Sequence, residues 1–329
     1  MVIEKILKEL TPERAKKEIE AIQKVKLPQK IQKLVREYEK VGERSEFLWK
    51  WLFCGDKIVI QSFNFSKKYY QLAIESTFLF NMFITLLDDI SEKKGNSNLL
   101  SELLKIPLEQ EHITSKPLDE KEKKYLLFTI KIWTQLEETI KKYPYYKRFK
   151  EIFRYDILQL LNTVRYFFLI YNEPYSINQS EYWAYSSHNM QVIITFDLYL
   201  MQSFDPSLKK NLGMYRETIL HLQEMARIGN CLGTWEREVK EKDFTSSGVF
   251  AYMLDSGILN IENLKNKNRL SLIKKIKKTE FERKLFERWE KKYQIINKTG
   301  EKLKKINMPR LLSAIEKITF YHLMGRGKI

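Results

Sequence analysis

Apolar residues recur at spacings of three and four along most of this chain, and no segment alternates convincingly at spacing two as a strand would. Residues at those spacings share one face of an α-helix, so each such segment has an apolar face to bury. Only 11 Gly and 8 Pro interrupt the 329 residues, which is typical of long helices joined by short turns. The pattern therefore predicts an all-α protein.

Proline positions and N-cap signals divide this pattern into separate helices. Thr11-Pro12, for example, pairs an N-cap residue with proline at the first helical position. We predict helices at 3–10, 12–24, 29–52, 66–92, 97–105, 118–141, 145–171, 179–203, 207–240, 247–254, 266–304 and 309–325. No Pro/Gly/Ser-rich linker divides the chain, so we expect residues 1–329 to form one antiparallel helical bundle, with the N-terminal helices in 1–60 packed on it.

The strongest chemical signal is an acidic cluster directly after a nearly all-apolar stretch, residues 78–87. Because residues three and four apart share a helix face, the carboxylates of Asp88, Asp89 and Glu92 can converge on one point. Such oxygens suit Mg²⁺, which binds one or two carboxylates and completes its shell with water and phosphate oxygens. The cluster predicts a charged site at the mouth of a buried space.

A second polar group lies much later in the chain. Asn230, Thr234 and Glu238 are spaced by four, so an amide, a hydroxyl and a carboxylate oxygen line up along one helix face, roughly 6 Å apart. All are hard oxygen ligands, and neither group offers a soft-metal set. The alternative for each group is a solvated helix face with unrelated polar residues, and this second triplet is the weaker signal of the two.

Together these two motifs resemble the Asp-rich motif and the Asn/Ser-or-Thr/Glu motif of class I terpene synthases. Length and helicity also resemble that family's single α-domain, although the first motif ends in Glu and Cys231 stands where Asp often follows the Asn. The resemblance implies the class I terpenoid (isoprenoid) synthase bundle and three Mg²⁺ ions, with Mn²⁺ as an alternative. Asp88, helped by Asp89 and Glu92, would bind two ions, and Asn230, Thr234 and Glu238 would bind the third.

The resemblance also implies a reaction. A prenyl diphosphate, farnesyl or geranylgeranyl diphosphate, would lose diphosphate and leave an allylic carbocation that cyclises or rearranges to a terpene hydrocarbon or alcohol. Basic residues would bind the diphosphate: Arg237 directly precedes the Glu of the second motif, and Arg310 lies near the place of an expected Arg-Tyr pair. Leu311 stands where the Tyr of this pair is expected, so Tyr321 is the candidate to supply the missing hydroxyl.

Residues 182–189 contain no Arg that could sense the diphosphate. His188, if protonated, is the substitute, although a lone helical His is more often a packing residue. Arg165, Arg227 and Lys240 are candidates from charge alone. The polar segment from Lys240 to Phe250 contains Ser-Ser-Gly and could be either a loop that closes over the site or an ordinary connection.

A carbocation needs a dry pocket with aromatic faces, each of which attracts a cation by about 0.5 to 2 kcal/mol. Aromatic residues flank both motifs, and the alternative for each is simple core packing. The candidates for the pocket wall are Phe78, Phe80, Phe83, Tyr182, Trp183, Phe196 and Tyr199.

Two other functions compete with terpene cyclisation. A related isoprenyl diphosphate chain-elongating synthase would share the fold and first motif, but that family has a second Asp-rich motif where this chain has Asn/Thr/Glu. A net charge of +16 also suits a basic helical scaffold for nucleic acid or a membrane surface. Since the Lys residues are scattered among Glu without a nucleic-acid-binding signature, we expect no nucleic-acid partner and at most weak peripheral membrane contact.

The remaining signals concern location and assembly. Cys54 and Cys231 are the only cysteines and form no disulfide framework. The amphipathic N-terminus lacks the apolar run of a signal peptide, and the most apolar stretches fall short of the about 20 residues of a membrane span. We expect a cytoplasmic protein, and the sequence leaves a homodimer open.

Overall fold

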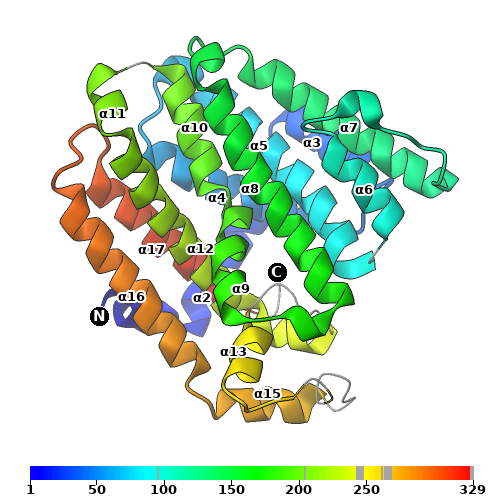
Figure 1. Ribbon diagram of the computed structural model, residues 1–329. Helices are drawn as coiled ribbons and strands as arrows, with labels where there is room; N and C mark the ends of the chain where they lie inside the picture. Colours follow the sequence, from blue (N-terminus) through cyan, green and yellow to red (C-terminus); the bar gives the residue numbers. More distant parts are fainter. Residues whose placement is uncertain (95, 204, 242–247, 261, 263–268, 327–329) are drawn as a thin grey trace.

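The computed structural model describes residues 1–94, 96–203, 205–241, 248–260, 262 and 269–326, without the side chains of residues 92–94 (Figure 1). Every regular element in these ranges is a helix, which confirms the all-α prediction. The first part of the chain forms α1 (Val2–Glu9), α2 (Pro12–Gln23), α3 (Gln29–Tyr38), α4 (Glu46–Ser62), α5 (Lys67–Asp88), the π-helix η1 (Asp89–Lys94) and α6 (Ser97–Lys105).

The rest of the described chain continues in the same way. Its middle part forms η2 (Gln110–His112), α7 (Glu120–Ile140), α8 (Tyr146–Asn172), η3 (Pro174–Ser176), α9 (Gln179–Tyr185), η4 (Ser186–Met190) and α10 (Val192–Gln202). The last part forms α11 (Pro206–Lys210), α12 (Leu212–Glu241), α13 (Val249–Asp255), α15 (Arg269–Lys277), α16 (Phe281–Gly300) and α17 (Met308–Met324).

Two long helices organise the bundle. α12 packs on α10, α16 and α17, whereas α5 packs on α4 and α7. Figure 1 shows α6 and α7 at one side of the molecule and α16 at the other. The apolar segment Lys67–Ser91 reaches 25 residues and is long and apolar enough to cross a membrane, contrary to our expectation. However, 72% of its most apolar window is buried, as in the core helix of a bundle.

Four of the predicted helices are interrupted in the structure. The predicted helix 29–52 breaks between Tyr38 and Glu46, and 266–304 breaks between Lys277 and Phe281. The predicted 207–240 is divided near Asn211, and 179–203 becomes α9, the 3₁₀ segment η4 and α10, with Gln191 in the left-handed region at φ 60°. The breaks are short, and the apolar spacing continues across them. The sequence pattern therefore predicted one continuous helix in each case.

The close approach of α12 and α17 gives a test of this packing. A Cβ added to Gly233 would lie 2.4 Å from the backbone oxygen of His322, so Gly233→Ala should force the helices apart. We expect it to lower the free energy of unfolding by about 1 to 3 kcal/mol in urea titrations. Gly213 of α12 has nothing within 4 Å of such a Cβ, so Gly213→Ala should instead be neutral or stabilising. Equal stabilities of the two variants would contradict the close approach.

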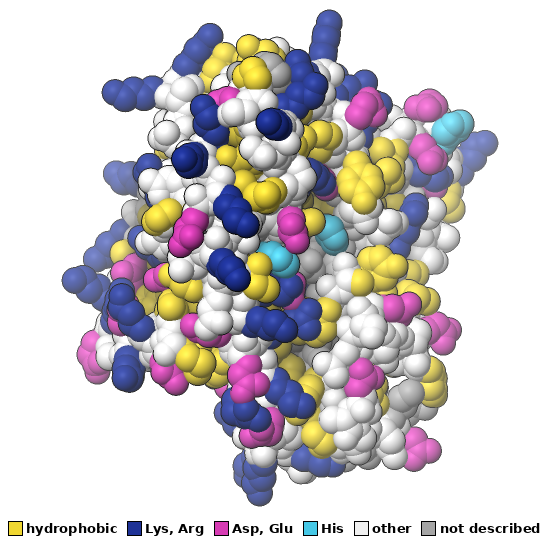
Figure 2. Space-filling view, turned by 60° about the vertical axis from the view of Figure 1, so that its left-hand side comes forward, with side chains coloured by type: hydrophobic (Ala, Val, Ile, Leu, Met, Phe, Trp, Pro, Cys, Tyr) yellow, Lys and Arg dark blue, Asp and Glu magenta, His cyan; other side chains and the backbone are white. Residues whose placement is uncertain are grey.

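The basic surface is dispersed on the face that Figure 2 shows. Lys and Arg side chains lie there among Asp and Glu rather than in one continuous stripe. Ion pairs such as Lys292 with Glu224 and Lys277 with Glu236 join neighbouring helices. Much of the positive charge is therefore matched locally.

Candidate active site

One cavity of about 420 Å³ lies among α4, α5, the η4–α10 break, α12 and α17. Its volume falls in the range of small-molecule sites. Four residues of the two sequence motifs lie on its wall: Asp88 at the end of α5, and Asn230, Thr234 and Glu238 along α12. The structure thus brings both motifs to one space, although they lie far apart in the sequence.

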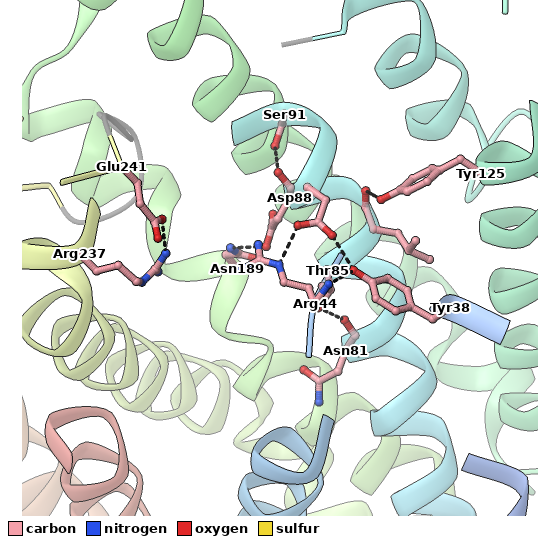
Figure 3. A network of polar contacts seen from close by, with 12 residues as sticks. Tyr38, Arg44, Asn81, Thr85, Asp88, Ser91, Tyr125, Asn189, Arg237 and Glu241 are labelled. Atoms are coloured by element: carbon pink, nitrogen blue, oxygen red, sulfur yellow. Dashed lines mark hydrogen bonds and ion pairs between the residues drawn. The ribbon is translucent and has the colours of Figure 1, made fainter. Parts of the chain in front are cut away.

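Asp88 is a carboxyl that the protein leaves largely uncompensated. Its Oδ2 accepts a hydrogen bond of 3.1 Å from Asn189 Nδ2, and its buried Oδ1 has no partner in the described part of the chain (Figure 3). Burial raises the pKa of Asp88 to about 7, although Asn189 and Arg44 act in the opposite direction. A cation at this place would stabilise the charged form of the carboxyl.

Asp89 has a different environment from its neighbour, which corrects its expected role as a metal ligand. Tyr38 donates to its Oδ2 at 2.9 Å, and Arg44 Nε donates to its Oδ1 at 2.8 Å. Asp89 is not among the residues that line the cavity. Consecutive helical residues point about 100° apart, so when Asp88 faces the cavity Asp89 faces α3 and its connection to α4. The side chain of Glu92, the third expected ligand, lies outside the described residues.

The contacts of Asp89 predict a structural role for it. Asp89→Asn removes the charge that pairs with Arg44 and places an amide group beside two donors. We expect the free energy of unfolding to fall by roughly 1.5 to 3 kcal/mol, measured by urea denaturation. Tyr38→Phe, which removes one neutral donor, should cost less. An Asp89→Asn protein as stable as wild type would show that the Arg44 pair contributes nothing.

The second motif offers its oxygens from successive turns of α12. The Thr234 hydroxyl donates to the Asn230 backbone oxygen at 2.9 Å, so its own lone pairs stay available. Asn230 Oδ1 accepts a bond of 3.0 Å from Arg227 Nη1. Glu238 is 1% exposed and lies 4.0 Å from Arg237 Nη2. Amide, hydroxyl and carboxylate oxygens therefore lie along the same wall.

These residues fit Mg²⁺ better than a metal that needs a protein-only cage. No group of three or more His, Cys, Asp or Glu in the described ranges could hold an ion by itself. Mg²⁺ is commonly bound by one or two carboxylates, with substrate phosphates and water as the other ligands. Asp88 and Glu238 supply such carboxylates, and the unpartnered Oδ1 of Asp88 is the observation that most favours a cation here.

Three arginines lie on the cavity wall: Arg44, Arg227 and Arg237. Arg237 was expected there, and it pairs at 2.6 Å with Glu241. Arg227, a candidate from charge alone, is 1% exposed, and its Nε donates to the Tyr182 hydroxyl at 3.1 Å. Arg44 was missed because it lies in a connection between helices. Its only sequence signal is a positive charge among many.

Arg310 and His188 lie away from the cavity, which corrects both assignments. Arg310 is exposed in the first turn of α17 and does not line the cavity; the nearest lining residue of that helix, Ile315, is roughly 8 Å further along it. Burial lowers the pKa of His188, so its ring is neutral at pH 7 and does not offer the positive charge that a diphosphate sensor needs. The neighbouring Asn189 lies on the wall instead.

The expected aromatic residues pack in or against the core and not on the cavity wall. Phe78 contacts Trp49, Phe80 contacts Phe153, Phe83 contacts Trp133, and Phe196 contacts Phe63. Tyr182 and Trp183 contact each other, and Tyr199 and Tyr321 pack beside Phe65 and Phe320. The aromatic side chains on the wall are Phe47 and Trp51 of α4, with the imidazole of His322.

The polar face of α5 explains this difference. Asn81, Ile84, Thr85 and Asp88 follow the spacing of one helix face, and they line the cavity while the phenylalanines point into the core. The polar residues three and seven positions before Asp88, Thr85 and Asn81, were the signal in the sequence. The segment Lys240–Phe250, expected as a loop, falls mainly on residues 242–247, which lie outside the described residues.

Two buried titratable groups lie on the same wall. Asp56 of α4 accepts a hydrogen bond of 2.7 Å from Asn81 Nδ2, and burial raises the pKa of Asp56 to about 8. Burial, together with nearby Arg227, lowers the pKa of His322 to about 3. At neutral pH the cavity therefore contains a mostly protonated carboxyl and an uncharged imidazole.

The pKa of Asp56 gives a prediction about stability. Folding raises it from 3.8 to about 8, so the folded state binds this proton more tightly than the unfolded state. The resulting stabilisation is complete below pH 3.8 and is lost as pH rises through about 8. Asp56→Asn removes the titration, so the stability of the variant relative to wild type should rise by on the order of 4 kcal/mol from pH 5 to pH 9. The free energy of unfolding of both proteins is measured by urea denaturation at each pH. A difference between them that stays constant from pH 5 to pH 9 would contradict the raised pKa.

Comparison with known proteins identifies the fold. No protein-family model matches the chain, and no curated protein matches it in sequence. Among solved structures, the geranylgeranyl pyrophosphate synthetase from the archaeon Geoglobus acetivorans superposes with a TM-score of 0.54 at 15% sequence identity, over 98% of each chain. The chain therefore has the all-α fold of the isoprenoid synthases.

Proposed function

We propose that this protein is a Mg²⁺-dependent class I terpene synthase that ionises a linear prenyl diphosphate, farnesyl or geranylgeranyl diphosphate, and guides the carbocation to a terpene hydrocarbon or alcohol. The observation that carries the proposal is the meeting of Asp88 with Asn230, Thr234 and Glu238 on the wall of one cavity. Metal-assisted loss of diphosphate needs both motifs at the same place, and the cavity is where they meet.

The residues of the wall divide into two groups with different tasks. Asp88, Asn230, Thr234 and Glu238 would hold Mg²⁺, which when bound neutralises the charge that develops on the departing diphosphate. Arg44, Arg227 and Arg237 would donate hydrogen bonds to the diphosphate oxygens, and charge-assisted bonds of this kind are the strong ones.

The other part of the wall would receive the hydrocarbon chain. Leu48, Leu52, Val59, Ile84, Val192, Ile315 and Ile318 supply apolar contacts there. Phe47 and Trp51 offer aromatic faces that attract a carbocation. These residues keep water away from a cation that water would quench.

Chain elongation is the second candidate, because the neighbour with the same fold is named a geranylgeranyl pyrophosphate synthetase. Against it stands the second motif, which is Asn/Thr/Glu in this chain where the elongating family has a second Asp-rich motif. We therefore place cyclisation first.

The deciding experiment supplies geranyl, farnesyl, geranylgeranyl and geranylfarnesyl diphosphates with and without Mg²⁺, and with and without isopentenyl diphosphate. Organic extracts are analysed by gas chromatography and mass spectrometry, and released diphosphate is measured. Mg²⁺-dependent hydrocarbon or alcohol from one substrate alone would support the synthase. Longer prenyl diphosphates formed only with isopentenyl diphosphate would show that the protein is a chain-elongating synthase. No diphosphate release from any substrate would reject both the terpene synthase and the elongating synthase.

A further inference from the structure

Asp56 and Asn81 form a polar pair on the cavity wall that the ionisation of a diphosphate does not use. Asn81 lies seven residues before Asp88 on α5, so the pair is about 10 Å along that helix from the end where the metal-binding motifs meet. Asn81 Nδ2 donates to Asp56 Oδ1 at 2.7 Å. Leu52 and Val59 of α4 and Ile84 of α5 make the nearby wall apolar.

The second oxygen of Asp56 needs an explanation. Asp56 is 7% exposed, and its Oδ2 is buried without a hydrogen-bond partner in the described part of the chain. A buried polar atom without a partner costs about 1 to 3 kcal/mol. An Asn at position 56 could accept the same bond from Asn81 without carrying an ionisable group, so joining α4 to α5 does not account for an acid here.

Burial also fixes the state of this acid. Because desolvation raises the pKa of Asp56 to about 8, the carboxyl is mostly protonated at pH 7 and its proton has no protein acceptor at Oδ2. No charged side chain contributes to that shift, since the hydrogen bond from Asn81 is the one opposing cause. The cavity thus has a neutral acid among apolar side chains, well removed from the diphosphate end.

We propose that Asp56 is an acid–base residue that transfers a proton to and from a hydrocarbon intermediate in the cavity, and that Asn81 positions its carboxyl. The inference rests on the proposed function, because it needs a prenyl cation to be formed first. That cation becomes a neutral alkene when a C–H proton passes to the departing diphosphate and the electron pair of the C–H bond forms the new C=C bond.

The Asp56 step then runs in two halves. The O–H proton of Asp56 adds to one carbon of a C=C bond, whose π electrons form the new C–H bond and leave a cation on the other carbon. The Asp56 carboxylate next takes a proton from a carbon beside the cation, and that C–H electron pair forms a new C=C bond. The acid is regenerated, and the hydrocarbon keeps its formula with rearranged bonds.

The test is turnover of the accepted prenyl diphosphate in D₂O, with diphosphate release and the deuterium content of the product measured separately. Asp56 exchanges its proton with D₂O between turnovers, so wild-type product should carry about one deuterium atom per molecule. Asp56→Asn keeps the shape of the residue and an acceptor for Asn81. It should release diphosphate within about threefold of the wild-type rate, but accumulate the earlier alkene with less than about a tenth of the deuterium.

Asp197→Asn is the matched control. Asp197 of α10 is also fully buried, and burial raises its pKa, but it faces Asp156 and Arg216 and is absent from the cavity wall. This variant should give wild-type product with wild-type deuterium content. Asn81→Ala keeps the acid but releases its carboxyl, so it should give a mixture of products that still carries deuterium.

A direct readout of the acid completes the experiment. The infrared difference spectrum between wild type and Asp56→Asn at pH 7 should contain the carbonyl stretch of a protonated carboxylic acid. The inference is overturned if wild-type product contains no deuterium, or if Asp56→Asn makes the same product with the same deuterium content. Absence of diphosphate release by the wild type is a different result, which overturns the proposed function and this inference with it.

Discussion

Asp88→Asn should lower the rate of Mg²⁺-dependent diphosphate release by a factor of about 10² to 10³ and leave the protein folded. The substitution keeps the volume of the side chain and the hydrogen bond from Asn189, but it removes a charged oxygen from the end of the cavity that we propose to hold Mg²⁺. Since Asp88 makes no ion pair in the described residues and its buried Oδ1 has no partner, an amide should cost little stability. Diphosphate release and thermal unfolding measured on the same preparation separate these two effects.

The adjacent residue supplies the control for this experiment. Asp89→Asn should show the reverse pattern, with a loss of stability from the broken Arg44 pair and a smaller loss of activity once the protein is assayed well below its melting temperature. Asp88 and Asp89 point in different directions at the end of α5, so we expect the first substitution to affect mainly activity and the second mainly stability. Equal loss of activity in both variants would instead place Asp89 among the metal ligands.

Arg227→Met should lower kcat/KM for diphosphate release by about 10²-fold, because a charge-assisted hydrogen bond to the substrate contributes about 1.5 to 3 kcal/mol. Arg227 is fully buried, with its guanidinium 5.3 Å from the Phe167 ring and bonded to both Tyr182 and Asn230. Methionine preserves much of the packing of the aliphatic stem, so the variant should remain folded, as circular dichroism would show.

Arg310→Met is the matched control for Arg227. The sequence predicted Arg310 as a diphosphate-binding residue, but it is exposed in the first turn of α17, away from the cavity. We expect kcat/KM to change by less than about twofold, as for most exposed positions without special contacts. Comparable losses in both variants would mean that the diphosphate binds elsewhere than in this cavity.

The helical class and the shared helix face within each motif could be predicted because both depend on local spacing, whereas the meeting of the two motifs was expected only from the family resemblance. The four-residue spacing of Asn230, Thr234 and Glu238 places them on one face of any helix, whatever its neighbours. The direction in which that face points depends on packing, which is why Asp89 turned out to bond with Arg44 rather than line the cavity.

Other parts of the site depend on contacts between distant segments and could not be read from spacing. An apolar residue next to a cavity and one in a filled core look alike in sequence, so Phe83 was expected on the wall and Trp51 was not. Similarly, nothing local distinguishes Asp56 from a solvated helical Asp. Its burial is created by α5 and becomes visible only in three dimensions.

α4 provides most of the side chains along the apolar part of the cavity, from Phe47 to Val59, whereas the two polar motifs belong to α5 and α12. Under the proposed function, departure of the leaving group and the shaping of the carbon skeleton would therefore depend on separate helices. Replacements along this single helix could give new carbon skeletons during divergence while ionisation stays intact. A library confined to α4 is accordingly the natural starting point for redirecting the product spectrum of this scaffold.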